Sequence, residues 1–330
     1  MNRSDRGQER LLDQVVDAAE DGRRADVALA AWLGETRGRA QSRLDAGDVT
    51  VDGVAITKSQ RLRTGQRVRV TAAEQAPSPM PDAIPVRYQD EHLLVVAKPA
   101  GLVVHAGAGT DPSTGSMVDG LTAMGVPLAD PCGPHAAACP TGRPGIVHRL
   151  DRGTSGLLVV ASTLAAHEGL TARFRSHDVE RVYTALVAGV PSPPRATIDA
   201  PIARSTARRT RFAVDPSGRR AISHYDLDED LGRAAVLTVR LETGRTHQVR
   251  VHLTAVGHPV CGDRLYGASP ALAAELGLDR PALHARRLAF VHPVTGARVA
   301  VDEPLPADLV AARETLRRLA GTAPRPRPGG

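Results

Sequence analysis

The densest group of side chains capable of chemistry stands in the stretch GIVHRLDRGTSGLLVVAS. One carboxylate, Asp151, lies between Arg149 and Arg152, and two hydroxyl side chains, Thr154 and Ser155, follow it. Neighbouring arginines favour the ionised form of a carboxylate, and an oriented carboxylate can act as a general base or a nucleophile. The same pattern is typical of a structural arginine–aspartate pair at the entrance to a strand, so these residues alone leave both interpretations open.

Two further stretches carry side chains suited to a nucleic-acid site. In LETGRTHQVRVHL, Arg245 stands where a predicted strand gives way to a predicted helix. It can reach a carboxylate on another strand, and the start of a helix favours an anion. In RVYTALVAG, Tyr183 lies within a strand. A lone strand tyrosine is usually a core residue, although an aromatic ring beside a base-binding pocket can stack on the base.

The elements that must position these side chains form a β-rich pattern. Strand-forming runs stand at 92–98, 156–162, 181–189 and 234–242. Helical patterns stand at 163–175, 246–257 and 307–321. Because helices do not regularly follow strands, a doubly wound parallel sheet is not expected. We therefore predict an α+β fold in which a mixed, mostly antiparallel sheet carries flanking helices.

The chain divides into five predicted segments. Residues 1–22 are a partly disordered extension, and residues 23–71 form a small basic α/β unit with two short helices and a hairpin that turns at Asp52-Gly53. The proline-rich residues 72–85 form a linker. Residues 86–320 form the larger domain that contains Asp151, and residues 321–330 form a disordered tail. The basic side chains of the second short helix are Arg37, Arg39 and Arg43.

The composition favours a protein of a reducing compartment. The three cysteines are an odd and sparse set, which argues against a disulfide framework. No run of 18 apolar residues exists, and the charged N-terminus lacks an apolar leader segment. We therefore expect a cytoplasmic protein without a membrane span. Cys132, His135 and Cys139 have the chemistry of zinc ligands but lack a nearby fourth ligand, so no metal is predicted.

The net charge of +6 comes almost entirely from arginine. The codon bias of a GC-rich genome would explain the arginine total as well as function would. The distribution is more informative, because residues 195–220 hold seven arginines against two aspartates. Such a local excess is typical of a surface that meets a phosphate-rich partner.

Four stretches in a fixed order resemble one family. KPAG, HRLDRGTSG, VYTALV and GRTHQVR, in that order, resemble the RluA-type family of RNA pseudouridine synthases. The resemblance covers about residues 23–300, and HRLD followed by TSG is its most specific part. The N-terminal unit resembles the S4-type RNA-binding domain that often precedes that catalytic domain. It departs from the family in ETRGRAQ, where a Ser-Arg-Ser run is common, and the larger domain has His105-Ala106 where His-Pro is usual.

The resemblance implies a role for each matching residue. Asp151 matches the catalytic aspartate, Arg245 the arginine that pairs with it, and Tyr183 the tyrosine that packs against a flipped-out uracil. The residues expected to shape the catalytic loop or contact the RNA are His148, Arg149, Arg152, Thr154, Ser155 and the three arginines of the second short helix. The reaction breaks the C1′–N1 bond and forms a C5–C1′ bond, so no cofactor and no metal is implied.

The predicted partner is structured RNA, with large-subunit ribosomal RNA as the first choice. We expect the protein to act as a monomer without membrane attachment. A transfer-RNA-directed synthase and a non-catalytic RNA-binding protein on the same scaffold are the alternatives. A hydrolase that uses Asp151 with His148 is a weaker one, because the chain has no nucleophile-elbow or metal motif.

Overall fold

The computed structural model describes two units of the chain separately. The described residues are 10–34, 40–41, 43–44, 49–57, 59–71, 84–105, 115–131, 143–205 and 211–322. One unit contains the described residues up to 71, and the other contains those from 84 onward. None of the helices within these ranges is long and apolar enough to span a membrane.

The N-terminal unit is a small antiparallel sheet covered by a helix. Its strands, in the order β1-β4-β2-β3, are Arg10–Val15, Arg67–Thr71, Val49–Val51 and Val54–Ala55. Helix α1 is Ala25–Trp32. Asp52 and Gly53 both have positive φ, 52° and 84°, as a two-residue hairpin turn requires. The predicted helix, hairpin and final strand of this unit are confirmed.

The prediction that residues 1–22 are an extension is wrong for the described part of that segment. Strand β1 pairs antiparallel with β4, where Leu12 lies opposite Val70, and Val16 is buried. Residues 10–15 therefore form an edge strand, and Val16 directly after it belongs to the core of this unit. Of the second predicted helix, Arg37 and Arg39 lie outside the described residues, while Arg43 is partly exposed.

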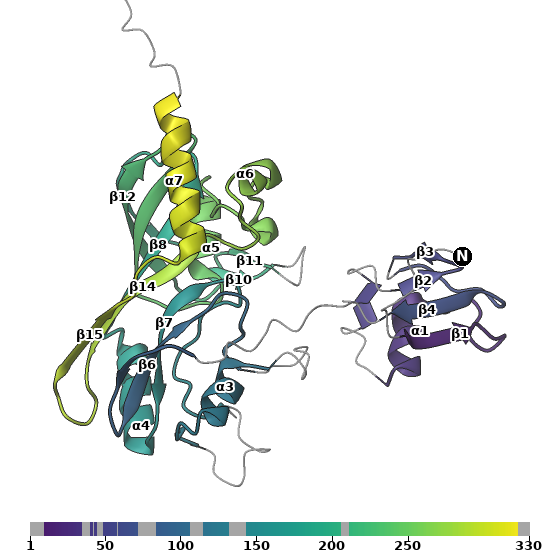
Figure 1. Cartoon of the computed structure of the whole chain (residues 1–330), viewed down its shortest axis with the longest axis horizontal. Helices are drawn as coiled ribbons and strands as arrows, with labels where there is room; N and C mark the ends of the chain where they lie inside the picture. The colour runs from purple at the N-terminus through teal and green to yellow at the C-terminus, as the bar shows by residue number, and fades with distance from the viewer. Residues whose placement is uncertain are drawn as a thin grey trace, which may run out of the picture. The chain divides into compact units, whose positions relative to one another are not determined.

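The larger unit is built on one mixed sheet (Figure 1). Its strand order is β5-β6-β7-β14-β8-β13-β12-β9, and β15 pairs with β14. Only β7 and β14 run parallel, and every other pair is antiparallel, which confirms the predicted fold class. In chain order the strands are β5 (Val86–Gln89), β6 (Leu93–Lys98), β7 (Ser155–Ala161), β8 (Val179–Ala188), β9 (Arg195–Asp199), β12 (Ile222–Asp230), β13 (Ala234–Leu241), β14 (Leu283–Val291) and β15 (Arg298–Asp302).

Helices flank this sheet. The helices are α3 (Met117–Ala123), α4 (Leu164–Ser176), α5 (Gln248–Ala255), α6 (Pro270–Glu275) and α7 (Ala307–Thr322). Of these, α4, α5 and α7 lie where the sequence predicted helices, whereas α3 and α6 were not predicted. A two-stranded ribbon, β10 with β11, is Ile202–Arg204 and Phe212–Val214, and the 3-10 turn η3 is Arg264–Tyr266. The Thr163 side chain caps α4 by accepting from the backbone N–H of Ala166.

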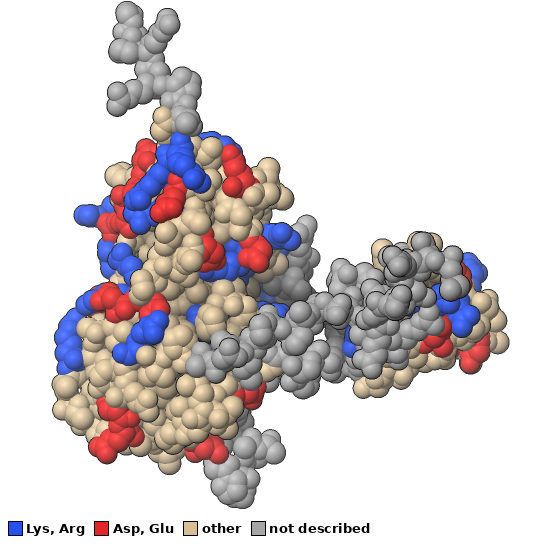
Figure 2. Space-filling model, in the orientation of Figure 1, with Lys and Arg blue, Asp and Glu red and all other residues tan. Residues whose placement is uncertain are grey.

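Helix α7 continues to Thr322, two residues into the segment predicted as a tail. Its first turn is held by Asp308, which accepts from Arg280 at 2.6 and 2.9 Å. Further along, Glu229 of β12 accepts from Arg317 at 2.8 and 3.0 Å. Figure 2 shows the result as neighbouring positive and negative side chains over this helix. The basic side chains Arg313 and Arg317 of α7 therefore form ion pairs within the protein.

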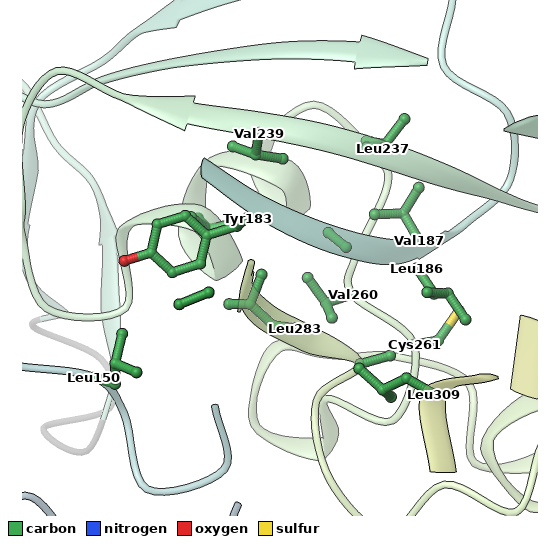
Figure 3. Close-up of a cluster of buried hydrophobic side chains, with 14 of the residues drawn as sticks. Leu150, Tyr183, Leu186, Val187, Leu237, Val239, Val260, Cys261, Leu283 and Leu309 are labelled. Atoms are coloured by element: carbon green, nitrogen blue, oxygen red, sulfur yellow. The ribbon is translucent and has the colours of Figure 1, made fainter. Parts of the chain in front are cut away.

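The core of the larger unit begins inside the predicted linker. Ile84 is 2% exposed and belongs to the main hydrophobic cluster, and the Pro85 carbonyl accepts from the backbone N–H of Ala97. The domain therefore includes Ile84, because its side chain is buried in the core and the next residue is hydrogen-bonded to β6. Figure 3 shows another part of this cluster, where Val187 and Leu237 lie on one side of β8 and Leu186 lies on its other side, beside Cys261.

Candidate active site

The loop that carries Asp151 is fixed at the point where it enters β7. Gly156 has φ +113°, and a Cβ atom there would lie 2.3 Å from the carbonyl oxygen of Ala285. The glycine therefore lets β7 approach β14 closely. The two strands pair only at residues 155 and 156 of β7. Beside it, the Ser155 hydroxyl lies 2.9 Å from Nδ1 of the buried His284. The Ser-Gly pair thus anchors the end of the loop.

Two cations hold the backbone of the same loop. The Lys98 ammonium, 1% exposed, donates to the carbonyls of Pro99, Leu102 and Arg152 at 2.8, 2.8 and 3.2 Å. Arg280 donates to the Gly153 carbonyl at 3.2 Å. Burial lowers the pKa of Lys98 to about 7, although the nearby Asp151 carboxylate opposes this shift. This lysine stands in the KPAG stretch, but only the structure shows that it binds the loop that carries Asp151.

Asp151 lies in a pocket against α5. Its side chain is 16% exposed, and its Oδ2 lies 3.1 Å from Nη1 of Arg250. The same guanidinium donates to both oxygens of the buried Asp263, at 2.6 and 2.9 Å. Burial alone would lower the pKa of Arg250, but its bonds to Asp263 and Asp151 raise it above the ordinary value. Arg250 is therefore a fixed cation that bridges two carboxylates.

The prediction that Arg245 pairs with Asp151 is wrong. Arg245 lines the pocket, but its Nε donates to the Arg220 carbonyl at 2.9 Å. Arg245 lies before α5, whereas Arg250 lies within its first turn and is 6% exposed. Sequence periodicity predicted the helix but did not show which of two arginines five positions apart turns toward Asp151. The apolar neighbours of Arg250 were the available signal that it is buried.

Tyr183 lies in the same pocket as Asp151. Its ring is 8% exposed and lines the pocket with Leu150, Leu283 and Thr154. Burial raises the pKa of its hydroxyl. Figure 3 shows the ring at one end of the core cluster, with the hydroxyl directed away from Val260 and Leu283. The structure therefore brings together two residues that are 32 positions apart in the sequence.

Three of the predicted loop residues line the pocket or its edge. The Thr154 side chain is 2% exposed, and its Oγ1 has no hydrogen-bond partner among the described residues. Arg149 is exposed and lines the pocket. Arg152 is exposed, and its Nε donates to the Gly101 carbonyl at 2.9 Å.

His148 has the loop-shaping task that the resemblance implied, rather than a contact with RNA. Its Nε2 accepts from the backbone N–H of Val159, and its ring stacks on Phe174 with centroids 4.4 Å apart. Burial, together with the nearby Arg181 charge, lowers the pKa of His148 to about 3. The ring is therefore neutral and structural, so the predicted contact with RNA is wrong. Its Nε2 is already hydrogen-bonded to Val159, which argues against a hydrolase in which His148 pairs with Asp151.

His247 and Gln248 were missed as site residues. His247 Nδ1 lies 2.7 Å from the Tyr266 hydroxyl, and its Nε2 lies 3.9 Å from Oδ1 of Asp151. Gln248 accepts from the Thr243 hydroxyl and the Arg245 N–H, and it donates to the Ile222 carbonyl. It thereby fixes the turn that precedes α5. Both residues stand in the GRTHQVR stretch, but the sequence analysis gave them no role because the chain's histidines showed no ligand spacing.

Comparison with known proteins identifies the family. Residues 92–255 match the family model described as RNA pseudouridylate synthase. An uncharacterized RNA pseudouridine synthase of Mycobacterium bovis is 43% identical over 90% of this chain and 95% of its own length. The chain belongs to the RluA-type family of RNA pseudouridine synthases.

Other relatives and one solved structure agree with this assignment. Ribosomal large subunit pseudouridine synthase D of Xanthomonas campestris is 41% identical to this synthase, over 93% of each chain. The structure of human RNA pseudouridylate synthase domain containing 4 superimposes with a TM-score of 0.54 and 25% identity. It covers 71% of this synthase and 93% of the human chain.

Among the residues described for this synthase, no group of three or more His, Cys, Asp or Glu side chains is arranged to hold a metal ion. Cys132, His135 and Cys139 lie outside those residues, so the prediction for that loop stays a prediction. Cys261 is buried and free, and burial raises the pKa of its thiol to about 12. This thiol is therefore protonated and packs as a core residue.

Proposed function

We propose that this enzyme isomerises uridines of large-subunit ribosomal RNA to pseudouridine, and that Asp151 is its catalytic residue. The observation that carries the proposal is the pocket in which Asp151, Tyr183 and Arg250 meet. The named substrate comes from relatives called ribosomal large subunit pseudouridine synthase D.

The chemistry requires the uridine to leave the RNA stack, because its glycosidic bond is otherwise out of reach. The C1′–N1 bond breaks, the uracil turns, and C5 bonds to C1′. C5 then loses its hydrogen as a proton and N1 gains a proton, so the product is an isomer of the substrate. Every atom of the product comes from the uridine and from solvent protons.

Each pocket residue has a proposed part in this sequence. Arg250 keeps the Asp151 carboxylate in one orientation. The ring of Tyr183 provides a flat wall against which the uracil packs. The buried Thr154 hydroxyl is available to a polar atom of the flipped nucleotide, since it has no partner among the described residues.

The surrounding arginines provide the proposed RNA contacts. Arg149 and Arg152 are exposed beside Asp151, where they can meet backbone phosphates or enter the space that the base vacates. Arg245 belongs to this group. We further propose that the N-terminal unit is an S4-type domain that binds RNA through Arg37, Arg39 and Arg43, and that the enzyme acts as a cytoplasmic monomer.

The decisive experiment maps pseudouridine in total RNA from cells with and without the gene. Loss of defined sites in large-subunit ribosomal RNA, restored by the wild-type gene, supports the proposal. Sites lost from transfer RNA instead would assign the alternative substrate. Unchanged RNA would leave only an RNA-binding function on this scaffold.

Asp151→Asn tests the catalytic residue. We expect the variant to form pseudouridine about a thousandfold more slowly or not at all, because a neutral amide cannot replace the carboxylate. RNA binding, measured by filter retention, should stay within about twofold of the wild type, since binding energy is spread over many phosphate contacts. Wild-type activity in this variant would refute the role of Asp151.

A further inference from the structure

The two oxygens of Asp151 face different groups. Oδ2 lies 3.1 Å from Nη1 of Arg250, whereas Oδ1 lies 3.9 Å from Nε2 of His247. The His247 side chain is 19% exposed and lines the same pocket. Arg250 therefore holds Oδ2, whereas the imidazole of His247 faces Oδ1.

Hydrogen bonding determines which nitrogen of His247 carries the proton. The backbone N–H of Phe212 donates to the Tyr266 hydroxyl at 3.0 Å. Of the partners that the described residues give this hydroxyl, only Nδ1 of His247, at 2.7 Å, can accept its proton. Burial, the largest influence, lowers the pKa of His247, which favours the neutral ring. An imidazole that accepts at Nδ1 carries its proton on Nε2, so an N–H group faces Asp151.

The ring of His247 is held in this orientation from several sides. The rings of Phe212 and Tyr266 meet it edge-on, with centroids 5.7 and 5.5 Å away. Its backbone has φ +59°, a left-handed conformation that a non-glycine residue adopts at a cost in energy. The surroundings of His247 therefore maintain an unfavourable backbone conformation that places this ring beside Asp151.

One short turn supports both groups that face Asp151. Asp263 is the N-cap of η3 and holds Arg250, and Tyr266 at the end of η3 holds His247. The Tyr266 ring also lies under the Arg250 guanidinium, 4.9 Å from its centroid. A turn of four residues thus sets the geometry of Arg250 and His247 together.

We propose that His247 is a positioning residue that donates a hydrogen bond from Nε2 to Oδ1 of Asp151 when RNA is bound. This inference rests on the proposed function of Asp151. The observed 3.9 Å is longer than a hydrogen bond, and such contacts commonly shorten when substrate binds. The other charged or titratable groups that face the pair are Arg250, Asp263, Arg149, Tyr183, Tyr266 and Lys98.

Substitutions of His247 test the hydrogen bond under single-turnover conditions with excess enzyme. His247→Phe removes the donor, and the rate of pseudouridine formation at saturating enzyme should fall about ten- to hundredfold, as for a hydrogen bond to a charged group. The enzyme concentration that gives half the maximal rate should change by less than about threefold, since the contact is to Asp151 and not to RNA. His247→Gln, whose amide N–H can reach the same position, should recover most of the rate.

Two outcomes would overturn the proposal. A wild-type rate in His247→Phe would mean that Asp151 needs no second donor. A His247→Gln rate as low as that of His247→Phe would mean that a titrating imidazole, rather than a hydrogen bond, is required.

A pair of tyrosine variants tests the support of His247, and it decides the question if His247→Phe fails to fold. Tyr266→Phe removes the hydroxyl that fixes the His247 proton, so the rate should fall several-fold. Tyr225→Phe is the matched control, because this buried hydroxyl binds the Pro193 carbonyl and lies outside the pocket. It should keep the wild-type rate. Equal losses in both variants would reduce His247 to a packing role and overturn the inference.

The wild-type enzyme separates this inference from the proposed function. If the wild type forms no pseudouridine in large-subunit ribosomal RNA, the proposed substrate fails. If the wild type is active and the His247 variants match it, only the positioning role of His247 fails.

Discussion

Arg250 illustrates how a single side chain can organise the site. Its one positive charge lies between Asp151 and the buried Asp263, and Asp263 takes the two shorter bonds. The bidentate pair fixes the plane of the guanidinium, which leaves Nη1 at a defined place for the Asp151 carboxylate. The role of Asp263 is thus to aim Arg250.

Arg250→Met should destabilise the enzyme by about 3–5 kcal/mol, because it leaves Asp263 buried without a cation. The double variant Arg250→Met/Asp263→Asn should regain most of this loss, since an uncharged amide is cheaper to bury. Urea unfolding followed by circular dichroism measures both. A double variant as unstable as the single one would show that the charge of Asp263 is not the cause.

At the scale of elements, the position of the loop that carries Asp151 is set by the strands around it. Gly156 brings β7 against β14, Lys98 at the end of β6 binds the loop backbone, and His148 ties the start of the loop to Val159 of β7. The sequence predicted a loop before a strand, which is a local pattern. The ties to β6 and β14 join residues more than 50 positions apart, so no local pattern could predict them.

His148 should make stability depend on pH. Its pKa of about 3 lies below the ordinary value of 6.5 that applies in the unfolded chain. Below pH 6.5 the unfolded chain therefore binds a proton that the folded chain does not, and stability falls as the pH falls toward 3. Between pH 7 and pH 5 the wild type should lose about 1–2 kcal/mol more than His148→Gln, which keeps an acceptor but does not titrate. Parallel pH dependences in urea unfolding would contradict this.

At the scale of the whole molecule, the chain consists of two units with separate cores. The N-terminal core includes Val16, which the sequence analysis placed outside it, and the catalytic core includes Ile84, which was placed in the linker. Both boundaries were missed for the same reason. One or a few apolar residues in a polar or proline-rich stretch show no periodicity, so only their packing partners show that they are buried.

The boundary at Ile84 can be tested with fragments. We expect residues 80–330 to fold and unfold as one unit, and residues 86–330 to be less stable by about 1.5–3 kcal/mol, because Ile84 is lost from the core. Thermal and urea unfolding of both fragments measure the difference. Equal stability would place the domain boundary after Ile84. The 80–330 fragment should also bind RNA more weakly than the full chain, since it lacks the N-terminal arginines.

The amino-acid sequence alone was enough to predict the family, the fold class and the loop that carries Asp151. Those conclusions rest on short motifs, alternating apolar residues and turn signals, all of which act between near neighbours. The choice of Arg250 over Arg245, the structural task of His148 and the approach of His247 to Asp151 were decided by tertiary structure alone. They depend on how α5, η3 and β7 pack, and packing joins residues from 13 to 99 positions apart, beyond the reach of any local pattern.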